Sequence, residues 1–131
     1  MEDIFDMIVD NNQSGVIEEI KKGNINTTDR ELYTPLHLAV AVDNFELTKL
    51  LLENGANLKA QDKWGNTPLH RAMSSYRGGD GKIIKYLIEQ GANIDIENYY
   101  GVSPRKVADI IANYDLKQFI PNWYFDTTFY P

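Results

Sequence analysis

The chain has 131 residues, of which 43% are hydrophobic and 24% charged, a composition typical of a folded domain that argues against global disorder. It contains no cysteine, which excludes disulfides, zinc ribbons and thiol chemistry, and its net charge of -6 argues against broad binding to nucleic-acid phosphates. No apolar run reaches the length of a membrane span and the first ten residues are acidic, unlike a signal peptide, so we expect a cytoplasmic protein without a membrane partner.

The N-terminal segment is the acidic part of the chain. Its first twenty residues hold six acidic side chains and no basic one, which leaves 13 of the 19 acids against all 13 Lys and Arg in the remainder. Two interpretations stay open for this charge. It solvates one end of the fold, or it favours a basic partner.

A six-residue segment recurs further along the chain. Residues 34–39 read Thr-Pro-Leu-His-Leu-Ala, and residues 67–72, at a spacing of 33, read Thr-Pro-Leu-His-Arg-Ala. A third copy, Ser-Pro-Arg-Lys-Val-Ala at 103–108, follows after 36 residues, with the extra residues in a Gly-rich insertion at 75–81. Residues 50–57 and 86–93 match each other in the same way and end in Gly-Ala-Asn. One structural unit is therefore used repeatedly.

Each unit predicts two helices and a loop. The hydroxyl of Thr34 caps a helix that has Pro35 in its first position, where the missing N–H costs nothing. A turn at 43–44 leads to a second helix over 45–53, which Gly55 ends with a left-handed cap. Residues 57–66 then form a protruding, hairpin-like loop.

These segments resemble the ankyrin-repeat family, whose signature is Thr-Pro-Leu-His-x-Ala at a period of 33. The resemblance implies an all-α solenoid of stacked helix-turn-helix units with hairpin-like loops, in one domain over 1–131. We expect four repeats, of which the first and last are degenerate caps. Their ranges are 1–28, 29–61, 62–97 with the insertion at 75–81, and 98–131, which includes an aromatic tail.

Two positions depart from the repeat. Leu32 stands where the later loops have Gly65 and Gly101, so we expect the first loop not to adopt the same positive-φ turn. Arg71 replaces Leu38, and it either places a charge on the groove side or covers apolar surface with its stem.

The sequence offers no residues for catalysis, a metal or a cofactor, and we expect a protein that is not an enzyme. The histidines His37 and His70 occupy equivalent places in adjacent repeats, and the family resemblance implies a structural role between loops. The segment 78–82 resembles a phosphate-binding loop only superficially, since Ile83 follows its lysine and no strand precedes it.

The family resemblance also implies a binding face formed by the loop tips and the exposed ends of the first helices. The alternative for its aromatic residues is packing within the protein. The candidate partner-binding residues are Arg30, Tyr33, Lys63, Trp64, Asn66, Arg71, Tyr76, Arg77, Tyr99 and Tyr100.

The C-terminal tail is unusually aromatic. Residues 119–131 contain six aromatic side chains, and Pro121 is expected to end the last helix. The tail either covers the apolar side of the final repeat or binds a partner, including a second copy of the chain. We otherwise expect a monomer.

The leading functional hypothesis is a protein-binding module that masks or inhibits its partner. Small ankyrin proteins include bacterial immunity proteins, so the resemblance extends this hypothesis to an immunity protein for a basic toxin. An adaptor that joins two proteins is the alternative, and a small-molecule enzyme is disfavoured.

Overall fold

The structure is a computed structural model that describes residues 2–111 and 115–120. The described residues contain helices and no strand, which confirms the all-α expectation. None of these helices is long and apolar enough to cross a membrane. The helices are α1 (Ile4–Val9), α2 (Gln13–Lys21), α3 (Pro35–Ala41), α4 (Phe45–Glu53), α5 (Pro68–Ser75), α6 (Lys82–Glu89), α7 (Pro104–Ile110) and the 3₁₀ helix η1 (Leu116–Phe119).

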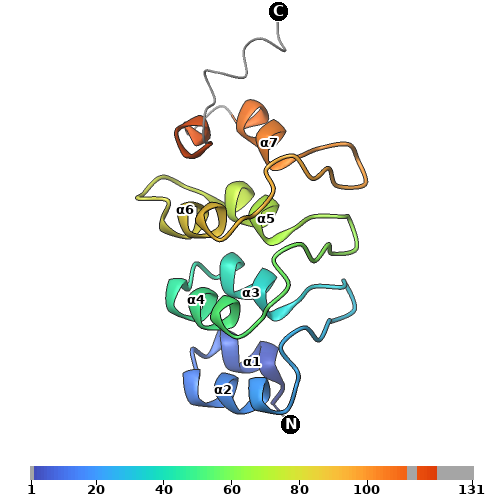
Figure 1. Ribbon diagram of the computed structural model, residues 1–131, viewed down its shortest axis with the longest axis vertical. Coiled ribbons are helices and arrows are strands. Elements are labelled where there is room, and N and C mark those ends of the chain that lie inside the picture. Colours follow the sequence, from blue (N-terminus) through green and yellow to red (C-terminus); the bar gives the residue numbers. More distant parts are fainter. Residues whose placement is uncertain (1, 112–114, 121–131) are drawn as a thin grey trace, which may run out of the picture.

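The helices stack as successive pairs along one axis, and a long loop projects from the same side of the stack after each of the first three pairs (Figure 1). The first helices of the pairs form one layer, in which α3 packs against α1 and α5, and α5 packs against α7. The second helices form the layer behind. Among the described helices, the main contacts between units thus join neighbouring units, as in a solenoid.

The start of each unit is built as the repeated segment predicts. The side chain of Thr34 accepts a hydrogen bond from the N–H of His37, and Pro35 occupies the first turn of α3. Thr67 and Ser103 cap α5 and α7 in the same way. The turns between helices also correspond, since Asn11 in the first unit and Asp43 in the second have φ of 53° and 57°. Helices α1 and α2 are thus joined by the same kind of turn, although this segment lacks the signature.

The core runs through the stack and changes at its end. Leu36 and Leu69, the leucines of the repeated segment, are buried at 0% and 1% exposure. The corresponding residue of α7 is Arg105, which instead pairs with Asp95 at 2.8 Å. After α7, the described residues contain η1, whose Phe119 is buried. The predicted role of Pro121 and the remaining aromatic tail lies outside the described residues.

The expectation for the first loop was wrong. Leu32 has φ of 59°, in the same region as Gly65 and Gly101, at 83° and 76°. The reason is an Asx residue at the start of each loop: Asp29 Oδ1 accepts hydrogen bonds from the N–H groups of residues 31 and 33, at 2.8 and 2.9 Å. Asp62 and Asn98 do the same in the later loops. These bonds hold the turn strongly enough to place a leucine in a strained conformation.

Candidate functional site

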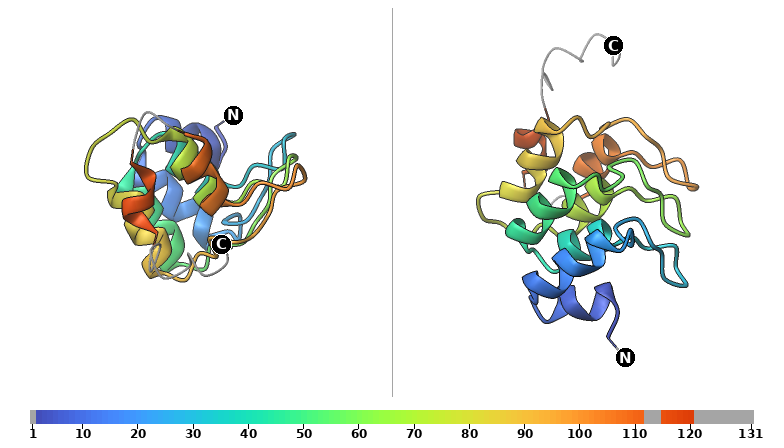
Figure 2. Two further views of the ribbon diagram at one scale, coloured as in Figure 1. Left: turned by 90° about the horizontal axis from the view of Figure 1, so that it is seen from above. Right: turned by 60° about the horizontal axis from the view of Figure 1, so that its bottom comes forward.

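The three projecting loops form hairpins that are hydrogen-bonded to one another at their tips. The backbone N–H of Lys63 donates to the carbonyl of Glu31 at 2.8 Å, and the N–H of Tyr99 donates to the carbonyl of Trp64 at 3.0 Å. Figure 2 shows the hairpins lying side by side, in register, away from the helices. Backbone bonds between neighbouring tips hold their side chains in a fixed row.

The two histidines connect the helices to this row. The Nε2 atoms of His37 and His70 lie 2.8 Å from the backbone carbonyls of Asn66 and Val102, each in the next hairpin. Their Nδ1 atoms accept a hydrogen bond from the N–H of the capping threonine. Burial lowers the pKa of both imidazoles, which favours the neutral form that this pattern requires. The geometry confirms the structural role that the family resemblance implied.

Large exposed side chains are concentrated at the tips. Tyr99 and Tyr100 are 67% and 74% exposed, and Trp64 is 38% exposed. Lys63 reaches over the Trp64 ring, 5.8 Å from its centroid, and pairs with Glu31 at 3.6 Å. We call the exposed residues Arg30, Lys63, Trp64, Tyr99 and Tyr100 the hairpin face.

Three of the predicted site residues lie behind this face and hold the hairpins. Tyr33 is half-buried and stacks on His37, with ring centroids 4.9 Å apart. Arg71 donates from Nε to the Tyr33 hydroxyl and lies over the same ring. Of the two interpretations left open for Arg71, the structure therefore supports a charge beside the hairpins, held by an aromatic partner. Asn66 accepts from His37 and, through Oδ1, from Asn98.

The structure does not bring Tyr76 and Arg77 to the hairpin face. They begin the inserted turn, residues 76–81, which Figure 2 shows on the far side of the helices from the hairpins. The Tyr76 ring packs edge-on against Phe119, with centroids 5.2 Å apart. The guanidinium of Arg77 donates to the carbonyls of Ser74 and Tyr76, at 2.9 Å each. A prediction of partner contact at these two residues thus concerns a second location.

One exposed apolar residue of the hairpins is absent from the predicted site residues, since Leu32 is 49% exposed in the first hairpin. The sequence already aligns Leu32 with Gly65, and their equal spacing from Asp29 and Asp62 is the signal that could have placed it at the tip. Among the described residues, no group of three or more His, Cys, Asp or Glu side chains could hold a metal ion.

This architecture, a helical solenoid with a row of stacked hairpins, defines a repeat scaffold. The family described as ankyrin repeats (3 copies) matches residues 5–98, and the chain therefore belongs to the ankyrin-repeat family. Such repeats indicate a protein–protein interaction module, and members of the family are typically not enzymes.

Three relatives show how widely the unit is used. The chain is similar to an ankyrin repeat protein of Rickettsia bellii, with 40% identity over 64% of this chain and 36% of the relative. It is 41% identical to the potassium channel GORK of Arabidopsis thaliana over 47% of this chain and 7% of the channel. It is 51% identical to human Rabankyrin-5 over 37% of this chain and 4% of that protein. The chain thus matches well under half the length of each.

Proposed function

We propose that this ankyrin-repeat protein binds one partner protein through the hairpin face and masks that partner's working surface. The observation that carries the proposal is the exposure of Trp64, Tyr99 and Tyr100 on hairpins whose backbones are bonded to one another. Trp and Tyr dominate the energetics of protein interfaces, and a prepositioned row loses little conformational entropy on binding. We propose the cytoplasm as its compartment, because a chain without cysteine forms no disulfides and needs no oxidising environment.

A basic partner, such as a toxin neutralised by an immunity protein, is the finer form of this proposal. Its support is the negative charge of the first repeat. Part of that charge is neutralised within the repeat itself. Glu18 and Glu19 pair with Lys21 and Lys22, at 3.3 and 3.5 Å. Asp3 and Asp6 form the capping box at the start of α1. The side chains of Asp3 and Asp6 are exposed to solvent, where they would attract a cationic surface of a partner.

The proposal is tested by capture of the partner with matched baits. The wild-type chain and a Trp64→Ala/Tyr100→Ala variant are used on lysate of the native source, and bound proteins are quantified by mass spectrometry. We expect one stoichiometric protein on the wild type and at least a tenfold loss on the variant, because removal of two interface aromatics costs about 2 kcal/mol or more. The thermal melting temperature should change little, because both side chains are exposed.

A Lys49→Ala bait is the control, since Lys49 is exposed on α4, away from the hairpins. The captured protein is then assayed alone and with the chain. Loss of its activity in the complex supports masking, and a basic isoelectric point supports the toxin form. Several proteins in one complex would support an adaptor instead. Equal capture by wild type and variant would contradict binding through the hairpin face.

A further inference from the structure

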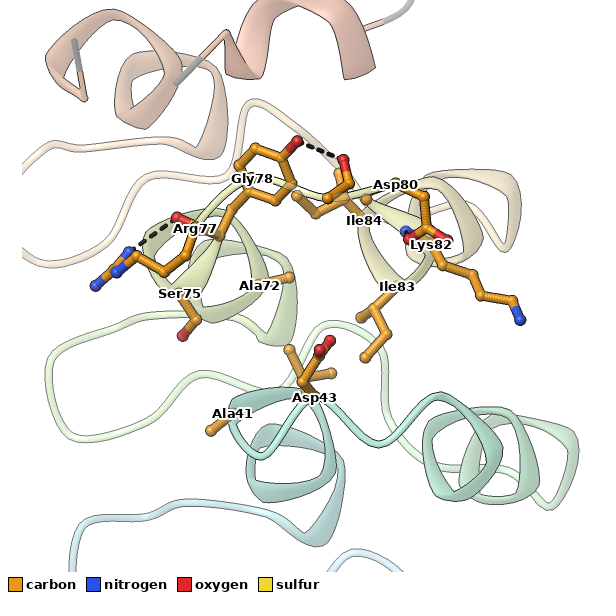
Figure 3. Close-up of a pocket in the computed structure, with 14 residues that line it drawn as sticks. Ala41, Asp43, Ala72, Ser75, Arg77, Gly78, Asp80, Lys82, Ile83 and Ile84 are labelled. Carbon is orange, nitrogen blue, oxygen red and sulfur yellow. Dashed lines mark hydrogen bonds between the residues drawn. The ribbon is translucent and has the colours of Figure 1, made fainter. Parts of the chain in front are cut away.

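A cavity of about 290 Å³ lies beneath the inserted turn. It is bounded by the C-terminal ends of α3 and α5, by the inserted turn and by the start of α6 (Figure 3). The inserted turn that lines it lies on the opposite side of the helices from the hairpins (Figure 2). It is therefore a separate location on the same solenoid.

The cavity arises where the insertion interrupts a contact between repeats. Between the first two repeats, the side-chain amide of Asn44 donates to Asn11 Oδ1 at 3.0 Å. The residue in the place of Asn44 before α6 is Gly81, which has no side chain to donate to Asp43, and the guanidinium of Arg77 bonds to main-chain carbonyls of its own turn. No hydrogen bond or ion pair is formed by the carboxylate of Asp43 within the described residues. Figure 3 shows this side chain directed into the space below the inserted turn.

Two acidic residues, Asp43 and Asp80, and two basic residues, Arg77 and Lys82, line the cavity. Arg77 and Lys82 extend away from its centre in Figure 3, and the Lys82 ammonium lies 4.4 Å from the centroid of the Phe45 ring. The positive N-terminus of α6 is offset by Asp80, whose Oδ1 accepts from the N–H of Lys82 at 3.0 Å. The carbonyl of Ser74 at the end of α5 is bound by Arg77, so it is the C-terminal end of α3 that adds to the negative charge of Asp43.

The walls suit a long side chain with a charged end. Val40, Ala72, Ile83 and Ile84 contribute buried apolar surface to the lining. The turn that covers them is held in place, because the Tyr76 hydroxyl donates to the carbonyl of Gly79 at 2.7 Å. An aliphatic stem would lie against the apolar wall while its cationic group reaches Asp43.

We propose that this cavity binds an arginine or lysine side chain of a partner protein, with Asp43 as the carboxylate that pairs with it. The origin of that side chain rests on the proposed function, since only a partner protein would present it. Binding of the cation itself does not depend on the hairpin face. The cavity below the inserted turn thus adds a charge-selective contact to the aromatic contacts proposed for the hairpin face.

The proposal is tested on the full chain with small probes. N-acetyl-arginine amide and its neutral analogue N-acetyl-citrulline amide are titrated at pH 7 while backbone amide resonances are followed by NMR. We expect the arginine probe to shift the amides of residues 41–43 and 76–84 in a saturable manner, with the citrulline probe at least about threefold weaker. The arginine probe is chosen because its planar fork can contact a carboxylate through two N–H groups.

Two matched variants remove one negative charge each. Asp43→Asn keeps a side chain suited to positive φ, as Asn11 shows at the equivalent turn, so the fold should be retained. It should weaken arginine binding by about threefold or more, whereas Glu53→Gln, at the exposed end of α4, should not change it. Equal binding of both probes, an unchanged Asp43→Asn variant, or shifts confined to other residues would overturn the site. Since no partner is present, this failure is distinct from loss of capture by the hairpin-face variant.

Discussion

At the scale of single residues, the two histidines link helix caps to hairpins and do so in the neutral form. Burial is the largest influence on each imidazole and lowers its pKa below the ordinary value of about 6.5. Hydrogen bonds to the carbonyls of Asn66 and Val102 act in the opposite direction and are weaker influences. The unfolded chain therefore takes up protons at a higher pH than the folded one. Stability is fully present above pH 6.5 and falls as the pH drops toward the folded-state pKa values.

We expect the free energy of unfolding to decrease between pH 7.5 and pH 5.5, by up to about 1.4 kcal/mol for each histidine at the lower pH. Urea titrations at several pH values within this interval measure the effect. The His70→Gln variant should be less stable at pH 7.5 and should show about half of the pH dependence. A wild-type stability that is constant over this range would show that the imidazoles are protonated without cost in the fold.

At the scale of elements, the turns show which glycines are required by space and which by backbone conformation alone. Gly81 precedes α6 with φ of 65°, and a Cβ built on it would overlap the ring of Phe119. Gly91, which follows α6, has φ of 98°, but a Cβ there meets no atom within 4 Å. The 3₁₀ helix η1 therefore packs onto the inserted turn through a contact that only glycine permits.

These two glycines make a matched pair of substitutions. Gly91→Ala should cost about 1–2 kcal/mol of stability, the cost of placing a side chain in the left-handed region. Gly81→Ala should cost about 1–3 kcal/mol more, because the ring of Phe119 must also move from a well-packed position. Denaturation in urea measures both variants. Equal losses would mean that Phe119 does not press on the inserted turn in solution.

At the scale of the whole molecule, features that depend on local chemistry could be predicted from the sequence. The helix caps follow from hydrogen bonds within a few residues, at Thr34, Thr67 and Ser103. The stacking of the repeats follows from their fixed spacing along the sequence. The contact of Arg71 with Tyr33 could not be predicted, because it joins side chains 38 positions apart whose directions depend on the stacked hairpins.

The direction in which the inserted turn projects could not be predicted from the sequence. The sequence spacing indicates where residues are added, but the side of the solenoid on which they project depends on the direction in which α5 ends. The sequence places Tyr76 and Arg77 beside the exposed ends of the first helices, and the cavity below them has no sequence signal beyond the insertion itself. The equivalent turn of the first repeat has a neutral residue, Asn11, in the place of the charged Asp43.

The solenoid also determines how far a local defect spreads. Leu69 is buried in α5, which packs against first helices on both sides, α3 and α7. Ile4 is equally buried, but among the first helices that the structure describes its helix α1 packs against α3 alone. In a chain of nearest-neighbour contacts, a weakened central unit uncouples the two halves, whereas a weakened terminal unit opens alone.

Leu69→Ala and Ile4→Ala should each cost about 2–5 kcal/mol locally, the usual range for such truncations in a packed core. Native-state hydrogen exchange shows which helices lose amide protection in each variant. Leu69→Ala should reduce protection in all of the helices that the structure describes, while Ile4→Ala should reduce it in α1 and α2 and leave α5 and α6 within about 0.5 kcal/mol of wild type. Uniform loss in both variants would instead make the repeats one cooperative unit, in which a partner bound at the hairpin face would stabilise α1 as much as α5.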